Sequence, residues 1–582
     1  MLLSRSCGDD ARLWLHPYER RAIKGSGTMN MITAKSKQRL LDVEKLSIAF
    51  GNVPIVKDIS FGVDAGEILG VVGESGSGKS ITCRSLLGLL PRAASVSGRI
   101  GFDGKNLLAL SGEEMRAIRG RDISMVFQNP ASHLDPLMTL GGHVMESLRH
   151  HFGQTRKEAR QNAIDVLREV QINEPERRID AYPHELSGGM KQRGMIGSAT
   201  ACRPRLLLAD EPTTALDVTV QARILDLLGE LNRTQGLSIV FVSHDLAVVA
   251  ELCHRVVVMR NGEIVEEGPA NEILRSPRHK YTKLLIDSQP SLLTLPPVAR
   301  EEQAKTPLIE VDALSITYSK PGALPGTRKD VVRALQEANL TVEAGESLGI
   351  VGESGSGKST VARAIMRLAE PSGGEIRFRG RNIAALKGTE LSEYRRKVQM
   401  VFQNPFDSLN PRMRIIDAIA EPMIRHGLAT RNEALGRARE LMRQVELPLE
   451  FADRKPRQLS GGQCQRVGIA RALALDPEVL IADEVTSALD VTIQAQILRL
   501  LQRLRSERHL TVIYISHDLS VVRKFCDRIA VFRAAKLVEL GSAEAVFDRP
   551  KESYTKLLLQ SAPRLERALE RTGASDAGHG RD

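Results

Sequence analysis

One eight-residue motif with phosphate-binding chemistry occurs twice in the chain. The sequence Gly-Glu-Ser-Gly-Ser-Gly-Lys-Ser begins at Gly73 and again, letter for letter, at Gly352. Glycines let such a loop turn its backbone N–H groups toward phosphate oxygens, and a following helix adds its positive end. The lysine reaches the β- and γ-phosphates, and the serine offers a hydroxyl to Mg²⁺. The repeat predicts two nucleotide sites, with ATP and Mg²⁺ as cofactors.

The residues expected to bind the nucleotide at these loops are Gly73, Glu74, Ser75, Gly76, Ser77, Gly78, Lys79, Ser80 and Ile81 in the first copy, and Gly352, Glu353, Ser354, Gly355, Ser356, Gly357, Lys358, Ser359 and Thr360 in the second.

An Asp-Glu pair follows an apolar run about 130 residues beyond each loop, as Asp210-Glu211 and Asp483-Glu484. The aspartates, with the loop serines, are expected to hold Mg²⁺. The glutamates lie next to the metal site and can polarise an attacking water, an effect worth about 10²- to 10⁴-fold in rate. One such pair is a weak signal because surface carboxylates are common. Its duplication at a similar spacing strengthens the signal.

Further landmarks recur at a nearly fixed offset. The serines of two Leu-Ser-Gly-Gly tetrads, Ser187 and Ser460, lie 273 positions apart, as do the two Asp-Glu pairs and the histidines of two Ser-His-Asp segments. Cys253 and Cys526 share the offset and precede apolar runs, which predicts packed core thiols. The pattern indicates a tandem duplication of a domain of about 250 residues.

Apolar runs indicate the elements that position these residues. Buried strands are expected at 68–72, 206–210 and 238–242, and a helix after Lys79. Strands alternating with helices predict a mostly parallel α/β sheet, whose ligands bind at the carboxyl ends of the strands. The expected domains are 39–288 and 307–563, joined by a proline-bearing linker at 289–306. A poorly ordered extension is expected at 1–38 and a flexible tail at 564–582.

Composition excludes some classes of protein. The 582 residues are 42% hydrophobic and 26% charged, and no apolar run of about 18 residues could span a bilayer. The net charge of +10 suits nucleic acid or an anionic membrane, but the dispersed basic residues favour a solvated surface. None of the six cysteines forms a CxxC pair, which argues against a zinc knuckle or an iron–sulfur cluster. The start lacks an apolar signal region, and Met29 or Met31 are alternative initiators.

The ordered motifs over about residues 40–290 and 307–562 resemble the ATP-binding subunits of ABC transporters. Each half has the P-loop, Phe-Gln-Asn-Pro, Leu-Ser-Gly-Gly, Asp-Glu, Ala-Leu-Asp and Ser-His-Asp in that order. The resemblance implies two P-loop ATPase domains, each with a RecA-like, mostly parallel core, an antiparallel β subdomain and a helical subdomain.

The resemblance also assigns roles to single residues. It implies that an aromatic residue stacks on adenine, a glutamine touches Mg²⁺ and the attacking water, a signature loop caps nucleotide, and a histidine contacts the γ-phosphate. A buried core aromatic is the alternative for the first role. The residues matched are Phe50 and Tyr318 for adenine, Gln128 and Gln403 for the metal and water, Ser187, Gly188, Gly189, Ser460, Gly461 and Gly462 for the signature, and His244 and His517 for the γ-phosphate.

Head-to-tail packing of two domains is typical of this family, so that the signature loop of one half caps the nucleotide of the other. We therefore expect Lys79 to pair with Ser460, and Lys358 with Ser187. ATP should then bridge the halves and ADP should release them. Both halves keep glutamate and histidine. Val485 in place of Pro212, and Cys464 in place of Lys191, bear on the rate of the Lys79/Ser460 site.

Several segments resemble the peptide/nickel importer branch, including Tyr-Thr-Lys-Leu-Leu at 281–285 and 554–558. The implied function is to energise import of peptides or related small solutes. The implied partners are two integral-membrane permease subunits and a periplasmic or extracellular solute-binding protein, at the cytoplasmic face of the inner membrane, with no nucleic acid and no direct cargo contact. Neither tail contains the cysteine-rich motif of many relatives, so no iron–sulfur centre is expected.

The alternative is a tandem ABC ATPase without a permease, acting on ribosomes or DNA. Ribosome-acting members usually carry a long charged helical linker, and DNA-repair members insert CxxC zinc modules; this sequence shows neither. A fused sugar-importer ATPase is a third possibility, but it often has one impaired half.

Overall fold

The computed structural model describes residues 38–214, 216–296, 298, 307–320, 330–487, 489–563 and 565. Most of the expected N-terminal extension, much of the linker and nearly all of the tail lie outside these residues. The domain bounds given above stay predictions.

Each half contains a six-stranded sheet in which five strands are parallel and one edge strand is antiparallel. In the first half the order is β10-β9-β3-β8-β7-β6. Strands β3, β6, β7 and β8 are buried along their whole length, because helices cover both faces of a parallel sheet. The bounds are β3 (Ile68–Val72), β6 (Ile123–Val126), β7 (Leu206–Asp210), β8 (Ser238–Ser243), β9 (Arg255–Arg260) and β10 (Glu263–Pro269).

The second half repeats this sheet in the order β16-β17-β18-β13-β19-β20. Its strands are β13 (Ser347–Gly352), β16 (Val398–Val401), β17 (Val479–Asp483), β18 (Thr511–Ile515), β19 (Arg528–Arg533) and β20 (Lys536–Ser542). The strands expected at 68–72 and 206–210 are confirmed, and the one expected at 238–242 extends by one residue.

A smaller antiparallel sheet accompanies each large one, in the orders β2-β1-β4-β5 and β12-β11-β14-β15. Its strands are β1 (Arg39–Phe50), β2 (Val53–Asp64), β4 (Ala94–Phe102) and β5 (Lys105–Asn106), and β11 (Pro307–Lys320), β12 (Asp330–Glu343), β14 (Gly373–Phe378) and β15 (Arg381–Asn382). This confirms the antiparallel subdomain that the family resemblance implied.

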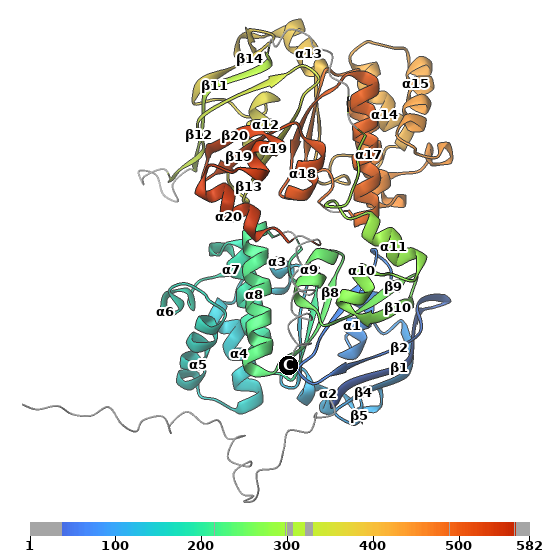
Figure 1. Cartoon of the computed structure of the whole chain (residues 1–582), viewed down its shortest axis with the longest axis vertical. Helices are drawn as coiled ribbons and strands as arrows, with labels where there is room; N and C mark the ends of the chain where they lie inside the picture. Colours follow the sequence, from blue (N-terminus) through green and yellow to red (C-terminus); the bar gives the residue numbers. More distant parts are fainter. Residues whose placement is uncertain are drawn as a thin grey trace, which may run out of the picture. The chain divides into compact units, whose positions relative to one another are not determined.

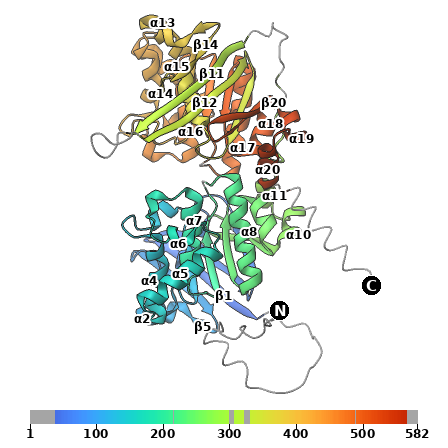
Figure 2. The same ribbon diagram turned by 90° about the vertical axis from the view of Figure 1, so that its left-hand side faces the viewer.

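Within each half, a group of helices lies on the side of the large sheet away from the small one. Figure 1 shows this for α14 and α15 relative to β11 and β14, and Figure 2 shows α4 to α7 gathered together in the first half. The first-half helices are α1 (Lys79–Leu86), α2 (Gly112–Ile118), α3 (Pro130–His133), α4 (Leu140–Phe152), α5 (Arg156–Glu169), α6 (Pro175–Arg178), α7 (Gly188–Thr200), α8 (Val218–Gln235), α9 (Leu246–Leu252), α10 (Ala270–Arg275) and α11 (Lys280–Asp287).

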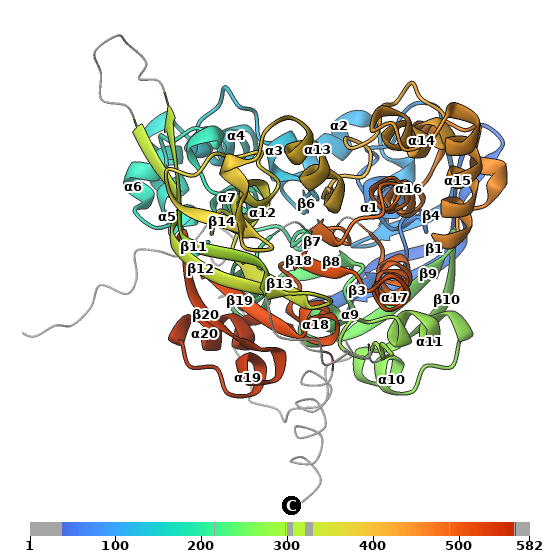
Figure 3. The ribbon, with the colours of Figure 1, turned by 90° about the horizontal axis from the view of Figure 1, so that it is seen from above.

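The corresponding second-half helices are α12 (Lys358–Ile365), α13 (Gly388–Lys397), α14 (Ile415–Arg425), α15 (Arg431–Gln444), α16 (Gly461–Leu473), α17 (Val491–Arg508), α18 (Leu519–Phe525), α19 (Ala543–Asp548) and α20 (Ser553–Ser561), and Figure 3 views them from above. Short 3₁₀ turns occur at Leu107–Ala109, Pro183–Glu185, Ile383–Ala385, Leu449–Phe451 and Pro456–Gln458. Within the described residues, no helix combines the length and the hydrophobicity that a membrane-spanning helix requires.

Local sequence explains where key helices begin. Thr155 and Glu158 form a reciprocal capping box at the start of α5, and Thr430 and Glu433 repeat it at α15.

Cys253 and Cys526 are buried in the two cores, as their apolar surroundings predicted, and burial raises the pKa of both thiols.

An apolar side chain that follows each half packs in the core of the other half. Leu293, which follows α11, is 1% exposed and packs in the apolar core of the second half, while Leu565, which follows α20, is 1% exposed in the core of the first. Gln502 Nε2 of α17 also donates to the Pro296 carbonyl at 2.8 Å. The described ends of the expected linker and tail are therefore packed, each on the other half.

Candidate active sites at the two P-loops

Each P-loop runs from a central strand into a helix, and its shape requires glycine. A Cβ atom on Gly73 would lie 2.2 Å from the Met259 carbonyl oxygen, too close for any other residue. Gly78, the N-cap of α1, has a φ of 101°, and its counterpart Gly357 has 106°. Only glycine reaches these angles without strain. The loops therefore have the tight backbone that cradles phosphate.

The P-loop lysines are buried and held by carbonyl groups of the loop itself. Lys79 Nζ donates to the carbonyl oxygens of Gly73 at 2.7 Å and Glu74 at 2.8 Å, and Lys358 makes the same two bonds. Burial lowers the pKa of both lysines, although nearby carboxylates oppose the shift. Each ammonium group is thereby oriented over its loop, where the resemblance expects phosphate.

The expected metal ligands lie together in both halves. Ser80 Oγ donates to Asp210 Oδ1 at 2.7 Å, and Ser359 Oγ donates to Asp483 Oδ1 at 3.1 Å. Both aspartates are buried, and burial raises their pKa despite the serine hydrogen bond. A hydroxyl and a carboxylate at the mouth of a phosphate loop are hard oxygen ligands, so these residues fit Mg²⁺.

Three side chains converge on the carboxylate of Glu211. Its Oε2 accepts from Gln128 Nε2 at 2.8 Å and from Thr214 Oγ1 at 2.9 Å, and lies 3.5 Å from His244 Nδ1. The residue follows β7 with a left-handed φ of 46°, an uncommon conformation that clusters at functional sites.

The second half assembles the same group with one difference. Glu484 Oε2 accepts from Gln403 Nε2 at 2.7 Å and lies 3.5 Å from His517 Nδ1. Ser487, at the position of Thr214, donates instead to the Glu484 carbonyl oxygen at 2.9 Å.

Each glutamate and histidine shift the other's ionisation. Burial by itself would raise the pKa of Glu211 and lower that of His244, but the hydrogen bond and opposite charges outweigh burial. The pKa of the glutamate is lowered and that of the histidine is raised, and Glu484 and His517 behave alike. The carboxylate is thus kept ionised, the state that a base requires.

Contacts between the halves fall at the P-loops. The N–H of Ser75 donates to Asp490 Oδ1 at 2.6 Å, and the N–H of Ser354 donates to Asp217. These aspartates belong to the Ala-Leu-Asp segments and are the N-caps of α17 and α8. Each P-loop therefore contacts the segment that follows the Asp-Glu pair of the other half.

Comparison with known proteins agrees with this geometry. Residues 56–214 and 335–487 match the family described as ABC transporter, and residues 265–308 and 538–581 match the family described as oligopeptide/dipeptide transporter, C-terminal region. The glutathione import ATP-binding protein GsiA of Escherichia coli (strain K12) is 41% identical over 568 residues, covering 91% of each chain. The peptidoglycan transport ATP-binding protein YejF of Agrobacterium fabrum is 43% identical over 536 residues, covering 91% of this chain and 97% of that protein.

A solved dimer of MJ0796, described as a bacterial ABC transporter cassette, matches with 36% identity over 40% of this chain and 98% of the other, at a TM-score of 0.37.

The chain belongs to the ABC transporter family. It is a tandem ATPase of that family, with two ATP-binding domains and two copies of the C-terminal region of oligopeptide/dipeptide transporters. The resemblance drawn from the duplicated motifs is confirmed, as is the α/β fold.

In this ABC transporter ATPase the signature serines begin helices. Ser187 and Ser460 are the N-caps of α7 and α16, and each hydroxyl accepts from a backbone N–H of its own helix. A Cβ atom on Gly189 would lie 2.6 Å from Val220 of α8, so the signature needs glycine for close helix packing. The pairing of each signature with the opposite P-loop stays a prediction.

The expected adenine-binding aromatics lie near the hairpin ends of the small sheets. Phe50 ends β1 and is half-buried, and Tyr318 in β11 is 44% exposed. Neither is a fully buried core aromatic, and stacking on adenine stays a prediction. Ile81 and Thr360 lie in the first turns of α1 and α12, beside the loops that they were expected to complete.

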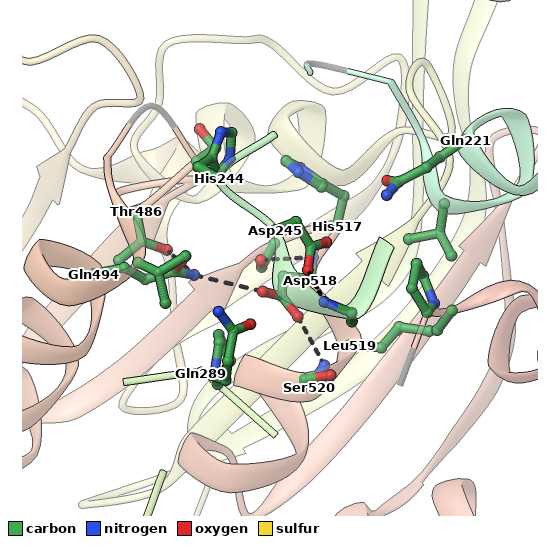
Figure 4. A pocket seen from close by; sticks show the side chains of 18 of the residues that line it. Gln221, His244, Asp245, Gln289, Thr486, Gln494, His517, Asp518, Leu519 and Ser520 are labelled. Carbon is green, nitrogen blue, oxygen red and sulfur yellow. Dashed lines mark hydrogen bonds between the residues drawn. The ribbon is translucent and has the colours of Figure 1, made fainter. Parts of the chain in front are cut away.

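A polar cavity of about 140 Å³ lies between the two histidine segments (Figure 4). It is lined from both halves, with His244 and Asp245 from one and His517 and Asp518 from the other. Burial raises the pKa of Asp245, and the Asp518 carboxylate adds to the effect. One polar cavity therefore lies beside the histidines of both candidate active sites.

The structure adds site residues that the sequence analysis missed. Thr214 holds the Glu211 carboxylate, and Thr219 and Thr492 reach the opposite P-loops. Thr219 and Thr492 share the 273-residue offset, and each follows an Ala-Leu-Asp aspartate by two positions. That duplication was a visible signal, although only the fold shows what the hydroxyls contact.

Proposed function

We propose that this ATPase energises import of peptides or peptide-like small solutes. It would act with two integral-membrane permease subunits and a periplasmic or extracellular solute-binding protein, at the cytoplasmic face of the inner membrane. Neither cargo nor nucleic acid would contact the chain.

The observation that carries this proposal is a complete catalytic group in each half, joined to a C-terminal region of the oligopeptide/dipeptide transporter type. Two relatives that are more than 40% identical to the chain are named for glutathione import and peptidoglycan transport. Both names involve molecules with peptide components, which supports a peptide-type solute. A sugar-importer ATPase with one impaired half fits less well, because both groups are intact.

We further propose that each ATP site is composite. Lys79 would act with Ser460 and Lys358 with Ser187, and the signature helix N-terminus would favour the γ-phosphate charge. The hydrogen bonds from Ser75 to Asp490 and from Ser354 to Asp217 support this arrangement, because they join each P-loop to the other half. ATP would then favour the closed state by binding it more tightly than the open one.

Hydrolysis would depend on the group around each glutamate. The ionised carboxylate of Glu211 or Glu484 would take a proton from the attacking water, while the neighbouring histidine contacts the γ-phosphate. The glutamine, which donates to the same carboxylate oxygen, would orient the base and the water. Mg²⁺, held by Ser80 and Asp210 or by Ser359 and Asp483, would neutralise phosphate charge.

The segments after Gln128 and Gln403, as far as Gly141 and Ile416, are the proposed contact surface for the permeases. Exposed apolar side chains support this placement: Leu137 is 86% exposed and Phe406 is 43% exposed. Because these segments follow the glutamines directly, permease movement could reach the catalytic carboxylates.

Affinity purification of the tagged chain from solubilised membranes tests the function. We expect two integral-membrane permeases to co-purify, and ATP turnover to rise when a loaded solute-binding protein is added to the reconstituted complex. Recovery of ribosomal proteins or DNA without permeases would instead support a permease-free tandem ATPase.

A further inference from the structure

The second residue of the first P-loop uses all of its polar groups. The N–H of Glu74 donates to Tyr281 Oη at 3.0 Å, and its carbonyl oxygen accepts from Lys79 Nζ at 2.8 Å. Its side-chain Oε1 accepts from Thr492 Oγ1 at 2.6 Å. One residue thus joins the phosphate-binding lysine, the C-terminal helix of its own half and the opposite half.

The second P-loop repeats this junction. The N–H of Glu353 donates to Tyr554 Oη at 3.2 Å, its carbonyl accepts from Lys358 Nζ at 2.8 Å, and its Oε1 accepts from Thr219 Oγ1 at 2.7 Å. The three kinds of bond recur in two halves that differ at many neighbouring positions. We call each set a P-loop clasp: Glu74, Tyr281 and Thr492 form the first, and Glu353, Tyr554 and Thr219 form the second.

The tyrosines are fixed in place by their surroundings. Tyr281 in α11 is 2% exposed, with the Arg260 guanidinium 4.8 Å from its ring, and Tyr554 in α20 is 4% exposed, with Arg533 at 4.9 Å. Burial raises the pKa of both hydroxyls to about 12, so both stay neutral near pH 7. Each offers a rigid neutral oxygen to the loop N–H. Both lie in the regions that match oligopeptide/dipeptide transporters.

The threonines extend the contacts between the halves. Thr492 lies in the first turn of α17, two positions after Asp490, which accepts the N–H of Ser75. The other half therefore holds two consecutive P-loop residues, one by its backbone and one by its side chain. Thr219 and Thr492 are 6% and 7% exposed, so water competes little for these bonds.

We propose that Tyr281, Tyr554, Thr219 and Thr492 are positioning residues that fix the two P-loops through Glu74 and Glu353. The clasps make phosphate binding depend on contact with the opposite half and on the C-terminal helices α11 and α20. This inference rests on the proposal that the opposite half completes each ATP site.

The clasps fix the conformation of the nucleotide-free loop before phosphate binds. Without the tyrosine oxygen a partly buried N–H loses its partner, and without the threonine hydroxyl the glutamate side chain is free to rotate away from the other half. Both changes loosen the loop in the ground state and the transition state alike. Such a loss of uniform binding raises KM and leaves kcat nearly unchanged.

The test substitutes the threonines by valine and the tyrosines by phenylalanine in the full chain. We expect Thr219→Val, Thr492→Val, Tyr281→Phe and Tyr554→Phe each to raise the KM for ATP by roughly 3- to 10-fold, with kcat within about twofold. ATP affinity, measured directly on a Glu211→Gln/Glu484→Gln background, should fall by a similar factor. Thr219→Ser and Thr492→Ser should restore it, because serine keeps the hydroxyl.

Matched controls remove similar hydroxyls elsewhere. Thr234→Val removes a hydroxyl of α8 that donates to the Glu230 carbonyl, and Tyr394→Phe removes a buried hydroxyl bonded to the Ile365 carbonyl. Neither should change the KM for ATP. In a double-mutant cycle, the losses of ATP affinity caused by Glu353→Ala and Thr219→Val should be markedly less than additive, because both variants remove the same hydrogen bond.

Additive effects in that cycle, or valine variants with wild-type KM, would overturn the clasp. The threonine series decides the matter if a phenylalanine variant fails to fold. If Glu211→Gln and Glu484→Gln block turnover while the valine variants behave as wild type, the clasp is wrong and the proposed ATPase mechanism stands. If those glutamine variants turn over ATP normally, the mechanism fails instead.

Discussion

The two halves present the same motif letters but hold the glutamates of their Asp-Glu pairs differently. Glu211 has a hydroxyl donor, Thr214 Oγ1, that Glu484 lacks, because Ser487 bonds to the backbone. Next to Glu484, the Thr486 hydroxyl pairs with Tyr514 Oη at 2.9 Å, where the first half has Phe241. The motif residues hold both glutamates alike, and positions beside the motifs give the two carboxylates different hydrogen bonds.

The signature helices differ as well. Ser460 and Gln463 form a reciprocal capping box at the start of α16, with the N–H of Ser460 donating to Gln463 Oε1 at 2.9 Å. Met190 stands at the matching position of α7 and accepts no such bond through its side chain. The site proposed for Lys358 and Ser187 therefore has the signature helix with one capping bond fewer, while Val485 and Cys464 fall in the second half. The halves are similar but not equivalent.

Removing the proposed catalytic carboxylates should have the largest effect on this comparison. Glu211→Gln and Glu484→Gln keep the shape of the side chain but remove its basicity, so each should lower turnover at its own site by about 10²- to 10⁴-fold. Steady-state ATPase rates of the two single variants and the double variant would measure the contribution of each half.

The exposed Glu113→Gln serves as the control for charge. Wild-type turnover in either single variant would show that the glutamate concerned is not a base.

A smaller effect should separate the two halves at the hydroxyl beside the base. Thr214→Ala removes a hydrogen bond to the Glu211 carboxylate and should change the rate of that site by about 3- to 10-fold, since one such bond contributes about 1 kcal/mol. Ser487→Ala removes only a hydrogen bond to a backbone carbonyl and should change the ATPase rate of the second-half site by less than about twofold. Single-turnover rates on the Glu484→Gln and Glu211→Gln backgrounds, respectively, isolate each site. Equal effects would remove this difference between the halves.

The glutamate–histidine pairs predict a defined pH dependence. The raised histidine pKa gives a contribution to the free energy of unfolding that is present below the unfolded pKa and lost as pH rises through the folded value. The lowered glutamate pKa gives a contribution that is lost as pH falls through its folded value. The pair therefore stabilises the nucleotide-free protein between these two limits.

NMR titration of His244 and His517 checks this directly. Glu211→Gln should lower the pKa of His244 and leave His517 nearly unchanged, and Glu484→Gln should do the reverse. Histidine pKa values that do not respond would contradict the pairing at 3.5 Å.

The smallest effect is expected at the signature helices. Gln463→Met should break the capping box of α16 and weaken ATP binding at the Lys79 site by about two- to fivefold, because such caps contribute about 0.5–1 kcal/mol. Met190→Gln should create a box at α7 and strengthen ATP binding at the Lys358 site by a similar factor. Equilibrium binding to hydrolysis-deficient variants measures both, and opposite signs would refute the capping argument.

Much of the fold could be predicted from local pattern. The strand at 68–72 and the P-loop helix follow from apolar runs and glycine placement, which depend on a few neighbouring residues. The candidate sites at Ser80, Asp210 and Glu211 could also be anticipated, because strand ends of a parallel sheet meet at one edge. The P-loop clasps could not, because their partners are more than 130 residues apart in sequence.

The sequence by itself determined the duplicated α/β domains, the glycine-rich loops and the Asp-Glu pairs at strand ends, since these depend on residue types at short spacing and on the recurrence of the same motifs along the chain. Only the tertiary structure decided that Thr214 and Ser487 bond differently to their glutamates, that Leu293 and Leu565 pack on opposite halves, and that Tyr281 and Tyr554 accept hydrogen bonds from the loops. The physical reason is that a hydroxyl has no fixed partner in the sequence. Its role depends on which donor or acceptor the packed chain brings within about 3 Å.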